Sequence, residues 1–244
     1  MKKITSIIIL SLSIIFIFGC GNVVKKSELN FRNGKYYYIN SDKPYSGKIV
    51  SYYENGQLEY SHNYKDGQKE GLSERYYENG QLKSSLNFKD DKKNGLCESY
   101  YKNGQLQESE NYKNGKLDGL YKSYYKNGQL KSSLNFKDDK KNGLCEWYYE
   151  NGQLESSGRN YRNGQIEGLS ERYYENGQLK SSSNHKNCYV HGSSKTYYEN
   201  GQLKSSRNYK RGWIVGLEEE YHENGQLKFS EDHGNGILNR LNEK

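Results

Sequence analysis

Histidine, serine and cysteine are the residues of this chain that could serve in catalysis or metal binding, but their spacing indicates neither a catalytic group nor a metal site. The five histidines stand at 62, 185, 191, 222 and 233, at different positions of a repeated unit described below. A metal site needs ligands that converge on one ion, and repeated units hold such positions apart. No serine lies in a G-x-S-x-G elbow, and no G-x-G-x-x-G precedes a helix. We therefore expect no catalytic residue, no metal and no cofactor, and a protein that is not an enzyme.

The cysteines follow the same logic. Cys97 and Cys145 hold the same position two units apart, and Cys188 stands alone. If each unit adds two strands, the first pair is separated by four strands, or roughly 19 Å at ~4.8 Å per strand. A disulfide requires Cα atoms within about 7 Å. The sequence therefore predicts thiols.

The N-terminus carries a different kind of signal. Lys2 and Lys3 precede an apolar run over residues 4–18, and Gly19-Cys20 follows. The run is short for a membrane span and is typical of the helix of an export signal. The letters "IFGC" resemble the bacterial lipobox, which implies that Cys20 is acylated after cleavage and that the protein is exported to the cell membrane or outer membrane. An ordinary signal peptide and an uncleaved anchor are the alternatives.

Composition favours strands and turns. There are 26 Tyr, 26 Gly, one Pro (Pro44) and no Ala. Leu, Ile, Val and Phe make up 34 of the 225 residues from 20 to 244, about 15%, which is typical of disordered chains. The tyrosines are strictly spaced, however, and Tyr favours strands. The net charge of +7 comes from interspersed Lys and Glu, which indicates a solvated surface and no nucleic-acid partner.

The spacing is that of a tandem repeat. The glycine of N-G-Q-L recurs at 56, 80, 104, 128, 152, 177, 201 and 225, which is every 24 residues apart from one step of 25. The extra residue lies near Gly158, where we expect a β-bulge. A second glycine recurs at 71, 95, 119, 143, 168, 192 and 216. Residues 79–98 also recur identically at 127–146, which indicates duplication of a pair of units.

One unit predicts one hairpin. In residues 71–95, Asn79-Gly80 favours a type I′ turn between strands over 72–78 and 81–88, and "KDDKKNG" returns the chain to the next hairpin. Counting from that turn, Tyr77 opposes Leu82, Arg75 opposes Ser84 and Ser73 opposes Leu86 on one face, while Tyr76 opposes Lys83 on the other. An even period keeps each face constant along the array.

The expected fold is therefore an all-β, elongated, single-layer antiparallel meander of tandem 24-residue hairpins after an N-terminal signal helix. The expected organisation is a signal peptide over 1–19, a tether over 20–30, a repeat array over 31–232 whose first unit, 31–55, is degenerate, and a C-terminal tail over 233–244.

The consensus "GLxExYYENGQLKSSxNYKDG" resembles the bacterial MORN-repeat variant, the unit of proteins catalogued as YwqK-family antitoxins of toxin–antitoxin systems. The lead-in over 36–56, with Pro44, Tyr45, Ser46 and Gly47, is similar to the usual opening of that family. The resemblance covers about 31–232. It implies hairpin repeats and a protein partner, which in that family is a cognate toxin, and it carries no toxin-facing residue over to this chain.

Three functions follow as hypotheses. The first is a non-enzymatic scaffold that is tethered to the membrane as a lipoprotein and binds a protein partner of unknown identity. The second is an antitoxin or immunity-type protein, and the third is a cell-wall or glycan-binding repeat protein, although Trp occurs only at 147 and 213. Packing alone would explain the tyrosine doublets; if they also bind a partner, the candidates are the second tyrosines, Tyr53, Tyr77, Tyr101, Tyr125, Tyr149, Tyr174 and Tyr198.

Overall fold

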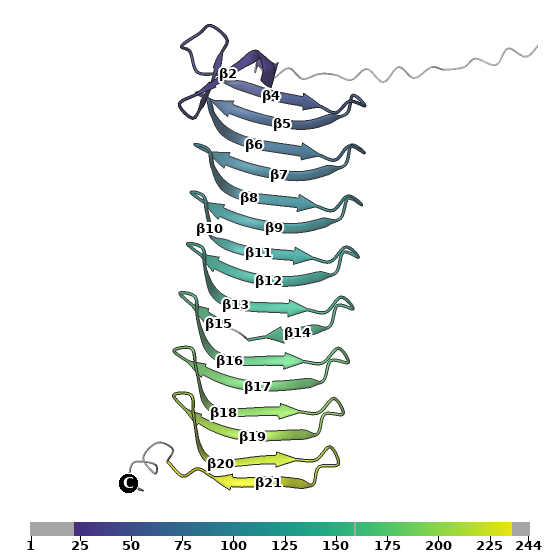
Figure 1. Ribbon diagram of the computed structural model, residues 1–244, viewed down its shortest axis with the longest axis vertical. Helices are drawn as coiled ribbons and strands as arrows, with labels where there is room; N and C mark the ends of the chain where they lie inside the picture. Colours follow the sequence, from purple (N-terminus) through teal and green to yellow (C-terminus); the bar gives the residue numbers. More distant parts are fainter. Residues whose placement is uncertain (1–21, 159, 236–244) are drawn as a thin grey trace, which may run out of the picture.

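The computed structural model describes residues 22–158 and 160–235, which form one long, single-layer sheet (Figure 1). The sheet has 19 strands. Strand β1 (Asn22–Lys25) pairs in parallel with β4 (Gly47–Tyr52), and from β4 to β21 (Leu227–Asp232) the pairing is antiparallel between neighbours along the chain. The exceptions are β10 and β11, which both pair with β9, and β14 and β15, which both pair with β13. Apart from one 3-10 turn, η1 (Lys26–Glu28), these residues contain no helix, which confirms the all-β meander. The signal helix expected over residues 1–19 lies outside the described residues.

The strands come in pairs that follow the repeat. A separate hairpin is formed by β2 (Leu29–Arg32) and β3 (Lys35–Tyr38). The remaining strands of the array are β5 (Leu58–Lys65), β6 (Gln68–Tyr76), β7 (Leu82–Lys89), β8 (Lys92–Tyr100), β9 (Leu106–Lys113), β10 (Lys116–Leu117), β11 (Gly119–Tyr124), β12 (Leu130–Lys137), β13 (Lys140–Tyr148), β14 (Leu154–Ser157), β15 (Asn160–Arg162), β16 (Gln165–Tyr173), β17 (Leu179–Lys186), β18 (Tyr189–Tyr197), β19 (Leu203–Lys210) and β20 (Trp213–Tyr221).

The Asn-Gly corner reverses the chain as expected, but its geometry differs from the prediction. At β6–β7 only Gly80 has a positive φ, of 83°, and the N–H of Gly80 donates to the carbonyl of Tyr77. This is the three-residue turn whose closing glycine makes a bulge, and not the type I′ turn that we predicted. The pairs Arg75–Ser84 and Ser73–Leu86 are confirmed.

Next to this corner the predicted register is wrong by one residue. Leu82 pairs with Tyr76, not with Tyr77, because the ladder shifts between Arg75 and Tyr76. The leucine therefore shares a face with the first tyrosine of the doublet, and the second tyrosine stands on the opposite face.

The type I′ turns lie at the other end of each hairpin. Asp90 and Asp91 have φ values of 49° and 60°, and Lys89 pairs with Lys92 across them. The "KDDKKNG" segment is therefore a tight turn and the start of β8, and not a return loop. Successive hairpins become one uninterrupted ladder because both ends of every strand are turns.

The second recurrent glycine bends the strands. Gly71 and Gly95 have φ values of 81° and 91°, and the ladder on that side shifts between Leu86 and Phe88. Only glycine adopts such a φ without strain inside a strand. The repeated bulge gives each long strand its curvature at the same point of every unit.

The N-terminal end has the one compact hydrophobic cluster of the described residues. Leu29, Tyr45 and Ile49 are buried, and Tyr36 and Tyr64 pack against them. Residues 22–30, in the range 20–30 over which we expected a tether, belong to this cap as β1, η1 and the start of β2. Tyr45 is fully buried and its hydroxyl donates to the carbonyl of Lys48, so the tyrosine of the lead-in motif closes the first edge of the sheet.

The 25-residue step is also visible. Gly158 has a φ of 75° and separates β14 from β15, so the extra residue breaks a strand at the place where we expected a bulge. The repeat register resumes in β16–β17, where Arg172 pairs with Ser181 as Arg75 pairs with Ser84. No helix in the described part of the chain is long and apolar enough to cross a membrane.

Candidate functional site

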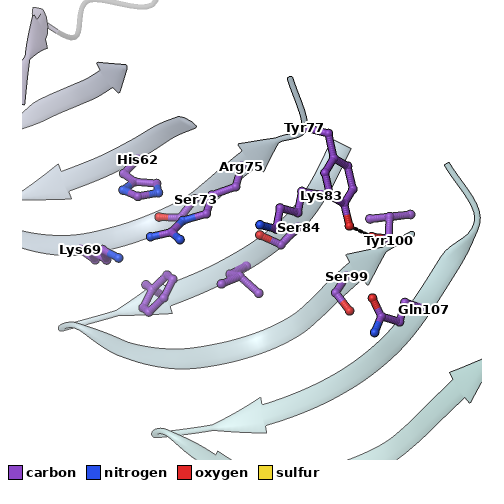
Figure 2. A pocket seen from close by; sticks show the side chains of 12 residues that line it. His62, Lys69, Ser73, Arg75, Tyr77, Lys83, Ser84, Ser99, Tyr100 and Gln107 are labelled. Carbon is purple, nitrogen blue, oxygen red and sulfur yellow. Dashed lines mark hydrogen bonds between the residues drawn. The ribbon is translucent and has the colours of Figure 1, made fainter. Parts of the chain in front are cut away.

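The two faces of the sheet differ in character. We call the face that carries Ser73, Arg75 and the second tyrosines the inner face, because the strands curve around these side chains (Figure 2). The reverse, or outer, face carries Leu72, Glu74 and the first tyrosines, as strand alternation requires. The hollows described below all lie on the inner face.

The second tyrosines form a hydrogen-bonded ladder along the array. Each hydroxyl donates to the backbone carbonyl of the first tyrosine in the following unit, at 2.8–2.9 Å. The donors are Tyr53, Tyr77, Tyr101, Tyr125, Tyr149, Tyr174 and Tyr198. All seven predicted binding residues thus lie in one row, but their hydroxyls join neighbouring units and their rings are half-buried.

Asparagine side chains make two further ladders. In the Asn-Gly corner, Asn103 Nδ2 donates to the carbonyl of Lys126 in the next unit, while its Oδ1 accepts the N–H of Gln105. At the glycine bulge, Asn87 Nδ2 donates to the carbonyl of Leu96 at 2.7 Å. These bonds connect each unit only to its neighbour, which is how repeat proteins are stabilised.

The inner face of the second unit is strongly basic. A cavity of about 250 Å³ there is lined by His62, Lys69, Arg75 and Lys83, and its lining contains no Asp or Glu (Figure 2). Burial, together with the charges of Lys69 and Arg75, lowers the pKa of His62 to about 4. Burial likewise lowers the pKa of Lys69, and Arg75 adds to the effect. The imidazole is therefore neutral at pH 7 inside a cluster of positive charge.

Several other charges of the inner face are compensated by ion pairs. In the third unit Lys93 is 3.4 Å from Glu110. In the last units Arg207 binds both Glu218 and Glu220, and His233 Nε2 lies 2.8 Å from Glu218. The hydrogen bond from Arg207 holds the pKa of Glu218 below its usual range. Arg75, Lys69 and Lys83 of the second unit, by contrast, form no ion pair with a described residue.

The outer face bears a row of exposed leucines. A leucine follows the bulge glycine in six of the eight units, and five of these, Leu72, Leu96, Leu144, Leu169 and Leu217, are 38–46% exposed. In adjacent units such leucines lie two strands, or about 10 Å, apart. Single exposed leucines at this spacing are ordinary surface features.

The candidate chemical residues stay dispersed. His62 stacks on Tyr60, with ring centroids 4.5 Å apart, and His185 contacts the hydroxyl of Ser183. Within residues 22–158 and 160–235, no group of three or more His, Cys, Asp and Glu side chains converges as metal ligands would. Cys20, the predicted lipidation site, lies outside the described residues.

The cysteines agree with the sequence prediction. Cys97 and Cys145 are buried, Cys188 is exposed, and none of the three forms a disulfide. Burial raises the pKa of the Cys97 thiol. The basic cavity of the second unit was not predicted from the sequence; the signal that could have found it is Arg75, at a position that six of the eight units fill with Ser, Thr, Trp or Glu.

Comparison with known proteins agrees with this architecture. Eight consecutive segments match the model of the MORN repeat variant family, namely residues 45–66, 69–90, 93–114, 117–138, 141–163, 166–187, 190–211 and 214–233. The chain therefore belongs to the MORN repeat variant family. Each matched segment begins just before a bulge glycine, so a unit runs from one type I′ turn to the next. No curated protein matches the chain significantly.

Proposed function

We propose that this protein is a non-enzymatic scaffold that binds a protein partner through the inner face of its repeat sheet. The observation that carries the proposal is the continuity of that face. The same row of tyrosine, lysine and serine side chains passes through cavities in units two, five and six to eight. A long, regularly spaced and curved surface of amphipathic aromatic and cationic side chains suits protein recognition.

The membrane tether is part of the same proposal. Acylation of Cys20 would place the cap, and with it the first unit, nearest to the membrane, because the cap begins at residue 22. Metabolic labelling with an alkyne fatty acid tests this in the wild type and in Cys20→Ala. Labelled wild-type protein and unlabelled variant support the anchor, and equal labelling of both argues against it.

The scaffold is tested by capture from intact cells. The full-length chain is cross-linked in place and recovered with its partners, and the same is done with an inner-face variant, Tyr174→Ala. Tyr76→Ala, in which an outer-face tyrosine is removed, is the matched control. We expect one partner that is lost from the first variant and retained in the control. Equal capture by all three forms would contradict a role for the inner face.

An antitoxin or immunity-type role is the second candidate, and it rests on the resemblance of the repeat consensus to YwqK-family antitoxins. It requires that the captured partner is toxic on its own. Co-expression should then restore growth, and the restoration should depend on the same inner-face tyrosine. A captured partner that is harmless to cells would exclude this role.

A further inference from the structure

We infer that the inner face binds an acidic protein segment at two built anion sites, one centred on Arg75 in the second unit and one on Arg172 in the sixth. This inference rests on the proposed function and gives its partner a chemistry. Of the eight units, only these two carry arginine at this position, and both have the sequence "SERYYENGQLKSS".

The first site presents positively charged side chains that are accessible and not paired with an acid. Arg75 and Lys83 are exposed, Lys69 is half-buried behind them, and none of the three forms an ion pair with a described residue. An arginine fork with two flanking ammonium groups is a receptor for a carboxylate. Asp91 is the acid whose charge acts on Lys69, and its Oδ1 accepts the backbone N–H of Lys69. It does not line this cavity but lines the adjoining hollow with His62, Lys69 and Arg75.

Unused hydrogen-bond donors point to a ligand in the same place. Ser73 is 2% exposed, lines the cavity, and its Oγ is buried with no hydrogen-bond partner among the described residues. Ser99 Oγ, on the next unit, is also buried and without a partner there. Native proteins satisfy nearly all buried polar groups, so these hydroxyls are donors available to a bound carboxylate. Figure 2 shows both serines on the same side of the sheet as Arg75.

The second site repeats the first. Arg172, Lys180 and Ser181 take the places of Arg75, Lys83 and Ser84, and Lys204 of the following unit joins them in a cavity of about 430 Å³. Two acids lie nearby. Glu220 is already bound by Arg207 at 2.7 Å, and Glu155 lines the adjoining hollow with Arg172 and Lys180. The net charge around Arg172 therefore remains positive.

The geometry favours a peptide over a glycan or a membrane. Lys83 Nζ lies 5.5 Å from the ring centroid of Tyr77, and Lys180 Nζ lies 5.1 Å from that of Tyr174, so ammonium groups occupy the ring faces on which a sugar would stack. The inner face is concave, so the flat surface of a bilayer cannot enter its cavities. A flexible acidic chain can enter both cavities.

The distance between the two sites determines the length of a segment that could occupy both. Four units, or eight strands, separate them, which is roughly 38 Å at ~4.8 Å per strand. An acidic segment with one charged cluster can occupy either site. A segment with two clusters and a linker of about 40 flexible residues, whose mean span matches ~35 Å, can occupy both.

The test uses fluorescein-labelled peptides and the full-length chain in neutral detergent micelles. One peptide carries a single tetra-glutamate cluster, and the other carries two clusters joined by a 40-residue Gly-Ser linker. Fluorescence anisotropy at low and at physiological salt gives the affinities. We expect the two-cluster peptide to bind about tenfold more tightly than the one-cluster peptide, and Arg75→Ser or Arg172→Ser to remove that advantage.

The controls come from the repeat itself. Ser99 is the natural residue at the Arg75 position in the third unit, so Arg75→Ser and Arg172→Ser place in each unit a residue that the repeat already accepts. The control Lys102→Gln with Lys126→Gln removes two positive charges, as many as the two arginine variants together, from exposed corners. As an independent readout, bound peptide should raise the pKa of His62, because a nearby carboxylate favours the charged imidazole.

Three results would overturn the inference. They are failure of the wild type to bind either peptide, an equal loss in the corner-lysine variant, and arginine-dependent binding that is tighter for a sulfated glycan or for vesicles of one-quarter phosphatidylglycerol. Failure of the proposed function is separate. If a partner is captured but the two arginine variants do not affect its capture, the scaffold proposal stands and this inference fails. If arginine-dependent peptide binding is seen but no partner is captured, the anion sites stand and the scaffold proposal fails.

Discussion

The tyrosine ladder should contribute measurably to stability, and one hydroxyl group isolates its effect. Tyr125 donates from its hydroxyl to the carbonyl of Tyr148 at 2.8 Å, between the fourth and fifth units. A neutral hydrogen bond contributes about 1 kcal/mol, and leaving a half-buried carbonyl short of a partner adds to the loss. We therefore expect Tyr125→Phe to lower the free energy of unfolding by about 1–2 kcal/mol.

The neighbouring tyrosine is a matched control. The hydroxyl of Tyr124 makes no hydrogen bond to a described residue, while its ring has the same half-buried environment. Tyr124→Phe removes the same atom from the same unit and leaves the backbone carbonyl at 124 in place to accept from Tyr101. Its effect should stay within about 0.5 kcal/mol.

Urea unfolding followed by circular dichroism measures the difference. With a slope of about 2 kcal/mol/M, Tyr125→Phe should move the midpoint down by roughly 0.5–1 M and the control by much less. Because repeat arrays can unfold in parts, amide hydrogen exchange should be read alongside it. The loss of protection should be concentrated in the units that meet at this bond. Identical midpoints for the two variants would show that the ladder contributes nothing and would refute the reasoning.

Three other outcomes follow from the structure. Gly67→Ala should destabilise the protein by several kcal/mol more than Gly56→Ala in thermal unfolding, because both have φ near 80° but only a Cβ at Gly67 would lie 2.8 Å from a backbone oxygen of the β2–β3 hairpin; equal losses would contradict the contact. The pKa of His62 falls from 6.5 to about 4 on folding, so the unfolded state binds the proton first and stability should drop by up to about 3 kcal/mol between pH 6.5 and pH 4; the same slope in His62→Gln would assign it to other groups. Iodoacetamide should modify exposed Cys188 at least about a hundred times faster than buried Cys97, as mass spectrometry of the native protein would show, and similar rates would mean that β8 opens readily.

The fold was readable from the sequence because its signals are local and repeated. The fixed spacing of Asn-Gly pairs and the alternation along each strand were enough to predict the meander and the Arg75–Ser84 pairing. The turn type was not readable. Asn-Gly serves both the type I′ turn and the bulged turn, and the dipeptide alone does not distinguish them; even the last corner, at Gly225, takes the bulged form.

The site was less predictable, for a physical reason. Sequence spacing identified the second tyrosines, but it could not show that their hydroxyls are used between units. The basic cavity brings His62, Arg75 and Lys83 together from three successive strands, and its character depends on which charges remain uncompensated after folding. Such a balance requires the positions of all neighbouring acids, which pairing rules alone do not give.

The identical stretches at 79–98 and 127–146 acquire a meaning from the ladder. Each unit meets the next through the same hydrogen bonds, so unequal recombination can insert or delete whole units without leaving an unmatched junction. Every insertion between Arg75 and Arg172 would move the two guanidinium groups apart by about 10 Å and alter neither of them. The distance between the two arginines can therefore change during evolution, in steps of one unit, without a change in either anion site.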